Sequence, residues 1–136
     1  MRRQEKYPDT KTFHYYNANP HNRITGDCSI RAVAFACQVP YNQVVMDLAR
    51  IQCETGYDSD KGMDILLKEY GWIKNRQPRH SDNTKFTVAE FVKVYKRGTY
   101  ILNMAGHNTV VKDGVDYDIW DCVKYGGTVG NYWTRG

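Results

Sequence analysis

The chain has 136 residues with 19 basic and 15 acidic side chains, which give a formal net charge of +4. Hydrophobic residues account for 41% and charged residues for 25%, so the composition is that of a folded domain and excludes a disordered chain. This length predicts one domain, residues 1–136, built around one core. The longest apolar run, Ala32 to Cys37, is far too short to cross a bilayer, so we expect no membrane partner.

The N-terminus and the cysteines indicate the compartment and the chemistry available. The opening sequence MRRQEKYPDTKTFHYY contains no apolar stretch of the kind that a signal peptide needs, so we expect a cytoplasmic protein. The four cysteines form no closely spaced pair of the kind that a zinc finger or ribbon requires. We therefore expect free thiols, no metal and no cofactor.

Residues 1–25 are polar and rich in turn-forming side chains. Asn19 precedes Pro20, and a residue before proline is kept out of the helical conformation. This segment is predicted to be the extended N-terminal approach of the domain, either a loop or an edge strand.

Residues 26–97 are predicted to be mainly helical. Apolar side chains recur at three- and four-residue steps after Asp27, which predicts a helix of about three turns that Thr25 or Asp27 caps and Pro40 ends. Further helices are predicted over residues 41–53, 63–70 and 88–95, the last with a capping box formed by Thr87 and Glu90.

Residues 98–136 have the composition of β-structure. Three segments rich in β-branched and aromatic side chains predict strands over residues 99–104, 107–111 and 115–120. Asp113-Gly114 predicts a two-residue hairpin turn between the last two strands, and residues 132–134 suit a final edge strand. The chain is therefore predicted to have an α+β fold, with N-terminal helices packed on a C-terminal antiparallel sheet.

Cys28 stands at the first turn of the first predicted helix. A helix N-terminus lowers the pKa of a thiol because its dipole and unpaired N–H groups stabilise the thiolate, which is the nucleophilic form. The same N–H groups can bind a developing oxyanion. The alternative interpretation is a small buried cysteine on an apolar helix face, which suits Cys37 and Cys53.

His107 begins a predicted strand, and the hairpin supplies it with an acidic partner. With Asp113-Gly114 as a two-residue turn, Thr109 faces Asp118, and Asp118 lies diagonally opposite His107 on the same face of the sheet. A three-residue turn brings Asp121 to that face instead. Either carboxylate can orient the imidazole, and the two-residue turn favours Asp118.

A cysteine that opens a helix, a Gly-His pair at a strand start and an acid on the next strand resemble the order found in papain-like cysteine peptidases. The segment from Asp118 to Trp120 looks like the Asn-Ser-Trp of the papain family, with Asp in place of Asn. GTYILNMAGHNTVVKDGVDYDIWD is also similar to bacteriocin-leader-type peptidases, which use Cys, His and Asp. NPHNRITGDCSIRAVAFA looks like a group of small proteins of bacteriophages and their bacterial hosts.

The resemblance implies a papain-like cysteine hydrolase, a peptidase or a related amidase or deamidase, that acts on a protein or peptide through a thioester on Cys28. His107 would be the general base and acid, and Asp118 its orienter. The papain family places a glutamine six residues before the cysteine, where its amide shares the oxyanion hole with the cysteine N–H; Asn22 stands there in this chain. Asp27 is a second departure, because its charge opposes thiolate formation unless it points away to cap the helix.

Two other functions stay open at this point. A non-catalytic phage accessory protein that keeps the fold and binds a host protein fits the departures at Asn22 and Asp27. Nucleic-acid binding through residues 74–97 is the third class, since this stretch is basic. It lacks a docking motif, so we expect no nucleic-acid partner.

Overall fold

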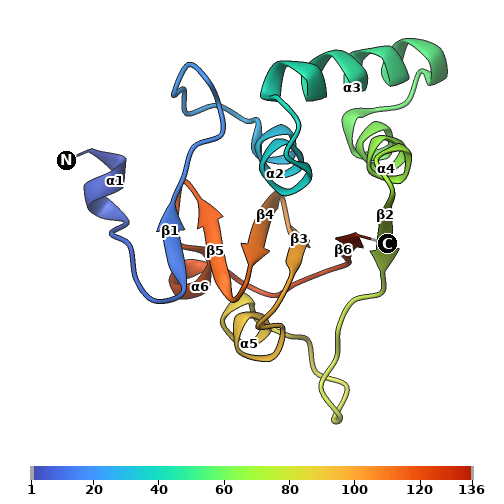
Figure 1. Cartoon of the computed structure of the whole chain (residues 1–136). Helices are drawn as coiled ribbons and strands as arrows, with labels where there is room; N and C mark the ends of the chain where they lie inside the picture. The colour runs from blue at the N-terminus through green and yellow to red at the C-terminus, as the bar shows by residue number, and fades with distance from the viewer. Residues whose placement is uncertain (1, 136) are drawn as a thin grey trace.

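A six-stranded mixed sheet runs through the centre of the computed structural model, which describes residues 2–135 (Figure 1). Across the sheet the strand order is β1-β5-β4-β3-β6-β2. The strands are β1 (Phe13–Tyr15), β2 (Trp72–Asn75), β3 (Thr99–Met104), β4 (His107–Lys112), β5 (Val115–Asp118) and β6 (Tyr132–Arg135). Together with six helices they form a mixed α+β structure, which confirms the predicted fold class at this level.

The hairpin between β4 and β5 has the predicted two-residue turn. Lys112 pairs with Val115, and both turn residues have positive φ, 51° at Asp113 and 77° at Gly114. Two such residues form a type I′ turn, whose twist matches that of the flanking strands. The register therefore brings the end of β5 beside the start of β4.

The sheet is larger than the antiparallel C-terminal sheet that the sequence predicts. The four C-terminal strands, β3 to β6, pair with one another in antiparallel fashion, as expected. In addition, β1 joins β5 in parallel and β2 pairs with β6. The prediction that residues 132–134 form an edge strand is wrong, because β6 lies between β3 and β2. Trp133 of β6 is 1% exposed, and burial on this scale suits an interior strand better than an edge.

The helices are α1 (Arg3–Lys6), α2 (Cys28–Cys37), α3 (Tyr41–Thr55), α4 (Ser59–Glu69), α5 (Val88–Val94) and α6 (Cys122–Tyr125). The predicted capping box of α5 is present, with Thr87 and Glu90 bonding to each other's backbone N–H groups. Helix α4 begins earlier than predicted because Asp58 accepts a hydrogen bond from the Lys61 N–H and caps it. Asp27 occupies the N-cap position of α2, as one of the two predicted alternatives requires, but its side chain makes no capping hydrogen bond.

Helices cover both faces of the sheet. On one face α2 and α4 pack against the strands, around a core that includes Val33, Leu66 and Trp133. Helix α3 lies across α2 and α4 on the side away from the sheet (Figure 1). On the other face α5 and α6 enclose a second core around Phe91 and Val111. Within residues 2–135, no helix has the length and apolar composition needed to cross a membrane.

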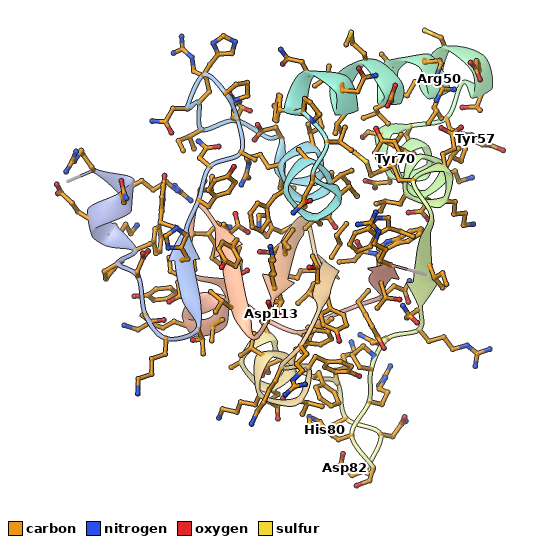
Figure 2. All side chains as sticks on the ribbon, viewed as in Figure 1. Arg50, Tyr57, Tyr70, His80, Asp82 and Asp113 are labelled. Carbon is orange, nitrogen blue, oxygen red and sulfur yellow. The ribbon has the colours of Figure 1, made fainter. Side chains whose placement is uncertain are left out.

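The basic stretch 74–97 is spread over β2, the following loop and α5. Figure 2 shows His80 and Asp82 in that loop, at the end of the molecule opposite α3 and Arg50. Lys74 pairs with Asp64 of α4 at 2.8 Å, so one of the basic side chains is engaged within the fold. The absence of a nucleic-acid partner stays a prediction.

Candidate active site

Cys28, His107 and Asp118 come together where the N-terminus of α2 meets the sheet. Cys28 is the first residue of α2, His107 the first of β4 and Asp118 the last of β5. Helix α2 packs against β4, and the tight β4–β5 turn sets the two strand ends side by side. Nε2 of His107 lies 2.6 Å from Oδ2 of Asp118. The structure therefore assembles the three side chains that the sequence singled out.

The thiol and the imidazole shift each other's proton affinity. A hydrogen bond from His107 lowers the pKa of Cys28, and it outweighs the half-burial that would raise it. Burial alone would lower the pKa of His107, but the hydrogen bonds to Asp118 and Cys28 raise it to about 9. A lowered thiol pKa and a raised imidazole pKa favour the thiolate–imidazolium pair between them.

Asp118 is fixed by contacts to both of its carboxylate oxygens. Oδ2 faces His107, while Oδ1 accepts hydrogen bonds from the Ile119 N–H at 2.7 Å and from Nη1 of Arg31 at 3.0 Å. Burial raises the pKa of Asp118, but the hydrogen bond and charge of His107 bring it below its ordinary value. Asp118 is therefore an ionised acceptor for the imidazole.

Asp121, the alternative acid, has a different role. Its carboxylate accepts hydrogen bonds from the N–H groups of Val123 and Lys124, each at 3.0 Å, and so caps α6. The two-residue hairpin turn is the cause, because a longer turn would have moved Asp121 to the face that holds His107. The acid beside the imidazole is Asp118.

Trp120 covers one side of the imidazole. Its ring centroid lies 5.0 Å from that of His107, with the two planes inclined by 50°. The His107 side chain is 14% exposed, so the His107–Asp118 hydrogen bond is shielded from most of the solvent. Shielding strengthens the electrostatic contact because less water competes for it.

Asp27 is joined to Arg31 rather than to the start of α2. Its Oδ1 accepts a hydrogen bond from Nε of Arg31 at 2.8 Å, and its Oδ2 accepts from the Tyr41 hydroxyl at 2.7 Å and from Nδ2 of Asn19 at 3.0 Å. Burial opposes ionisation, but these hydrogen bonds bring the pKa of Asp27 below its ordinary value. The negative charge beside Cys28 is thus balanced by a buried guanidinium.

Arg31 is a site residue that sequence reasoning missed. It is 6% exposed and joins Asp27 to Asp118 through two different nitrogens. The spacing of Asp27 and Arg31 is the i,i+4 spacing of a helical ion pair, and that signal was available in the sequence. The contact with Asp118 was not, because it spans 87 residues.

The structure does not bring Asn22 to the cleft. Asn22 is exposed in the loop before α2, with φ of 54°, and its N–H bonds to the Asn19 carbonyl in a turn. The amides that line the cleft are those of Asn103 and Asn108, and the latter donates to the Ser29 hydroxyl. The N–H of Cys28 itself lies at the helix start, where backbone donors lack intrahelical partners.

A cleft of about 420 Å³ opens beside Cys28 and His107. It lies between α2 and α4 over one face of the sheet. Apolar and charged side chains both line it, the apolar group including Val33, Met63, Leu67, Ile101 and Trp133 and the charged group Asp60, Lys61, Asp64 and Lys74. Cys28 and His107 are both part of its lining, so the cleft opens onto the thiol.

His107, Asp118 and Cys122 form a group whose ligand atoms lie within 4.8 Å of one another. Such a group can in principle hold a cation. However, burial raises the pKa of the Cys122 thiol far above its ordinary value, so the thiol stays protonated. Asp118 already forms an ion pair with Arg31. These residues fit a protonated thiol beside an ion pair better than a metal site.

The other cysteines differ from Cys28. Burial raises the pKa of Cys37 to about 12, and Cys53 is exposed on α3. They provide internal references for the reactivity of Cys28.

The chain matches no protein-family model, no curated protein and no solved structure.

Proposed function

We propose that this protein is a papain-like cysteine hydrolase that cleaves an amide bond of a protein or peptide by acyl transfer through Cys28. The observation that carries the proposal is the set of three side chains at the cleft, where His107 lies beside Cys28 in the lining and bonds to Asp118 at 2.6 Å. A nucleophile, a base and an orienter of the base are the minimum for this chemistry.

The arrangement of elements supports a papain-like assignment. The nucleophile begins a helix that packs on a sheet, the histidine begins a strand, and the acid ends the next strand with Trp120 two residues later. This is the order of elements and residues that the resemblance implies. Asp replaces the usual Asn, and a buried carboxylate can also orient an imidazole and stabilise its charged form.

The first half of the reaction is acylation. The Cys28 thiolate attacks the carbonyl carbon, and the oxygen becomes an oxyanion near the N–H groups at the start of α2. The oxyanion then reforms the carbonyl, the C–N bond breaks, and the amine leaves with the proton that His107 carried. The product is a thioester on Cys28 and a neutral His107 that still bonds to Asp118 through Nε2.

The second half is deacylation. His107 takes a proton from water through Nδ1, the nitrogen that Asp118 leaves free, and the hydroxide oxygen attacks the thioester carbonyl. The C–S bond breaks, the acid is released, and the thiolate–imidazolium pair is restored. An amine in place of water would give transfer rather than hydrolysis by the same steps.

The proposal is tested with p-nitrophenyl acetate, a small activated ester that requires no specific binding site. We expect intact-mass and peptide mapping to find an acetyl group on Cys28, formed faster than on exposed Cys53 and removed over time. Cys28→Ser and His107→Ala should each abolish this rapid turnover. Acetylation of Cys28 no faster than that of Cys53 would contradict the proposal and favour the alternative, a non-catalytic protein that binds a host partner.

A further inference from the structure

We propose that Arg31 is a positioning residue of this site, which holds the Asp118 carboxylate in the orientation that receives His107. The inference rests on the proposed function, because it assigns a task to Arg31 in the Cys28 site. Its basis is a continuous buried chain of contacts that runs from His107 through Asp118 and Arg31 to Asp27.

The carboxylate of Asp118 is held from two sides. Nη1 of Arg31 lies 3.0 Å from Oδ1, and Nε2 of His107 lies 2.6 Å from Oδ2. Rotation of the carboxylate would break the contact between Oδ1 and Arg31. This contact therefore keeps Oδ2 directed at the imidazole. The Ile119 N–H donates to the same oxygen, Oδ1, and Arg31 is the side chain that holds it. The orientation of His107 relative to Cys28 therefore depends on Arg31 together with this backbone contact.

Arg31 is itself immobilised. Its Nε donates to Asp27 at 2.8 Å, and Asp27 is held in turn by Tyr41 and Asn19. A guanidinium presents its donors in a fixed planar fork, so one side chain can hold two carboxylates at a set angle. Arg31 also lies one turn after Cys28, so the helix that carries the nucleophile also fixes the acid.

Two buried carboxyl groups on β5 differ in their partners, because Asp118 contacts His107 and Arg31 whereas Asp116 contacts neither. Asp116 accepts hydrogen bonds from Thr109 and the Cys122 N–H, and burial raises its pKa well above the ordinary value. Asp118 is nearly as buried, yet its pKa is below the ordinary value. Once His107 has given its proton to the leaving group, Arg31 is the cation that still contacts Asp118.

An ionised Asp118 keeps the remaining proton of His107 on Nε2 and leaves Nδ1 free to act as the base for water. The titratable or charged side chains around this pair and its cleft include Cys28 and Asp27 of α2, Tyr41 of α3, Asp116 and Tyr117 of β5, Cys122 of α6, Asp60, Lys61 and Asp64 of α4, Lys74 of β2, and Tyr16 after β1. The two lysines of that set, Lys61 and Lys74, lie on the cleft wall, whereas Arg31 bonds directly to Asp118.

The test uses the double variant Arg31→Met/Asp27→Asn, which removes the Arg31–Asp27 pair together and leaves His107 as the charged partner of Asp118. The control is Arg50→Met/Glu69→Gln, which removes an exposed ion pair between α3 and α4 with the same N–O distance, 2.8 Å, as the Arg31–Asp27 pair. The measured quantity is the rate of Cys28 alkylation by iodoacetamide over a range of about pH 5 to pH 10, which spans the ordinary pKa of a thiol. Circular dichroism checks that each variant is folded. Arg31→Lys keeps the charge without the fork, and serves if the double variant does not fold.

We expect the acidic limb of the Cys28 profile to move to higher pH by about one unit in the double variant, which lowers the rate at pH 6 about tenfold. The reason is that a loosely held Asp118 stabilises the imidazolium less. Arg31→Lys should move it in the same direction by less, and the control should not move it. A profile that stays in place, or moves to lower pH, overturns the inference.

Failure of the inference and failure of the proposed function have different signatures. An unchanged double variant beside a wild-type Cys28 that reacts fast at pH 6 overturns only the role of Arg31. A wild-type Cys28 that titrates like Cys53 overturns the proposed function, and the ¹⁵N titration of the His107 ring then decides the inference alone. A lower pKa of His107 in the double variant supports it, and an unchanged or higher pKa overturns it.

Discussion

At the scale of single residues, two neighbouring aspartates are separated by what each contacts. Asp118 bonds to His107, whereas Asp121 caps α6. Asp118→Asn removes the negative charge that raises the pKa of His107, so the rate of Cys28 alkylation at pH 6 should fall by about tenfold or more. Asp121→Asn keeps a good capping side chain and should leave that rate unchanged. Equal effects of the two substitutions would contradict the assignment of the acid.

Asp116 gives a second prediction at this scale. Its folded-state pKa is raised, so between the unfolded pKa near 3.9 and the folded value the folded chain holds a proton that the unfolded chain has lost. Asp116 therefore makes the free energy of unfolding fall as pH rises through this range. In Asp116→Asn this dependence is absent. The free energy of unfolding of the variant, relative to that of wild type, should therefore rise as the pH is raised from about 4 to about 7. Urea melts at several pH values check it, and a constant difference would refute it.

At the scale of elements, the β4–β5 turn carries the register on which the site depends. Gly114 has φ of 77°, and a Cβ there would lie in ordinary contact with the Val92 carbonyl at 3.5 Å. Gly114→Ala therefore adds backbone strain without a clash, and should lower the free energy of unfolding by about 1–2 kcal/mol. Gly127→Ala is the control, since Gly127 lacks positive φ and has open space around its Cα. Similar melting temperatures for both variants would argue against the strained turn.

The longer elements could be predicted from the sequence because each carries its own signal. Helix α5 has a capping box, α3 ends at Gly56 in the left-handed conformation, and the β4–β5 turn contains Asp-Gly. Strands β1 and β2 could not be predicted in the same way. They have three and four residues, too few for a hydrophobic period, and their partners lie far along the chain.

At the scale of the whole molecule, the N-terminal segment contributes β1 at the edge of the central sheet, which confirms the edge strand among the two predicted alternatives. Phe13 of β1 is 0% exposed and pairs with Asp116 of the central sheet. Phe13→Ala should lower the free energy of unfolding by about 3–5 kcal/mol, because it leaves a cavity in the core. Ile24→Ala, at a side chain that is 52% exposed, should change it by about 0.5 kcal/mol or less. Chemical denaturation of both variants decides whether the segment belongs to the folded unit.

The candidate site was predictable to the extent that it is local. Helix position predicts an activated thiol at Cys28, and the hairpin register predicts the pairing of His107 with Asp118. The tie between Arg31 and Asp118 required the packing of α2 on β4, which no local pattern encodes. The resemblance to the papain family implied an oxyanion-hole role for Asn22, but the turn that its N–H closes with Asn19 holds it outside the cleft.

The most direct test of an activated thiol is the rate of Cys28 alkylation against pH in the wild type and in His107→Ala. Cys53, exposed on another helix, is the reference within the same molecule. We expect Cys28 to react fast well below the ordinary thiol pKa of about 8.5. In His107→Ala its profile should move to higher pH, since the hydrogen bond that lowers the pKa of Cys28 is lost. A Cys28 that titrates like Cys53, or that is unaffected by the loss of His107, would contradict the account.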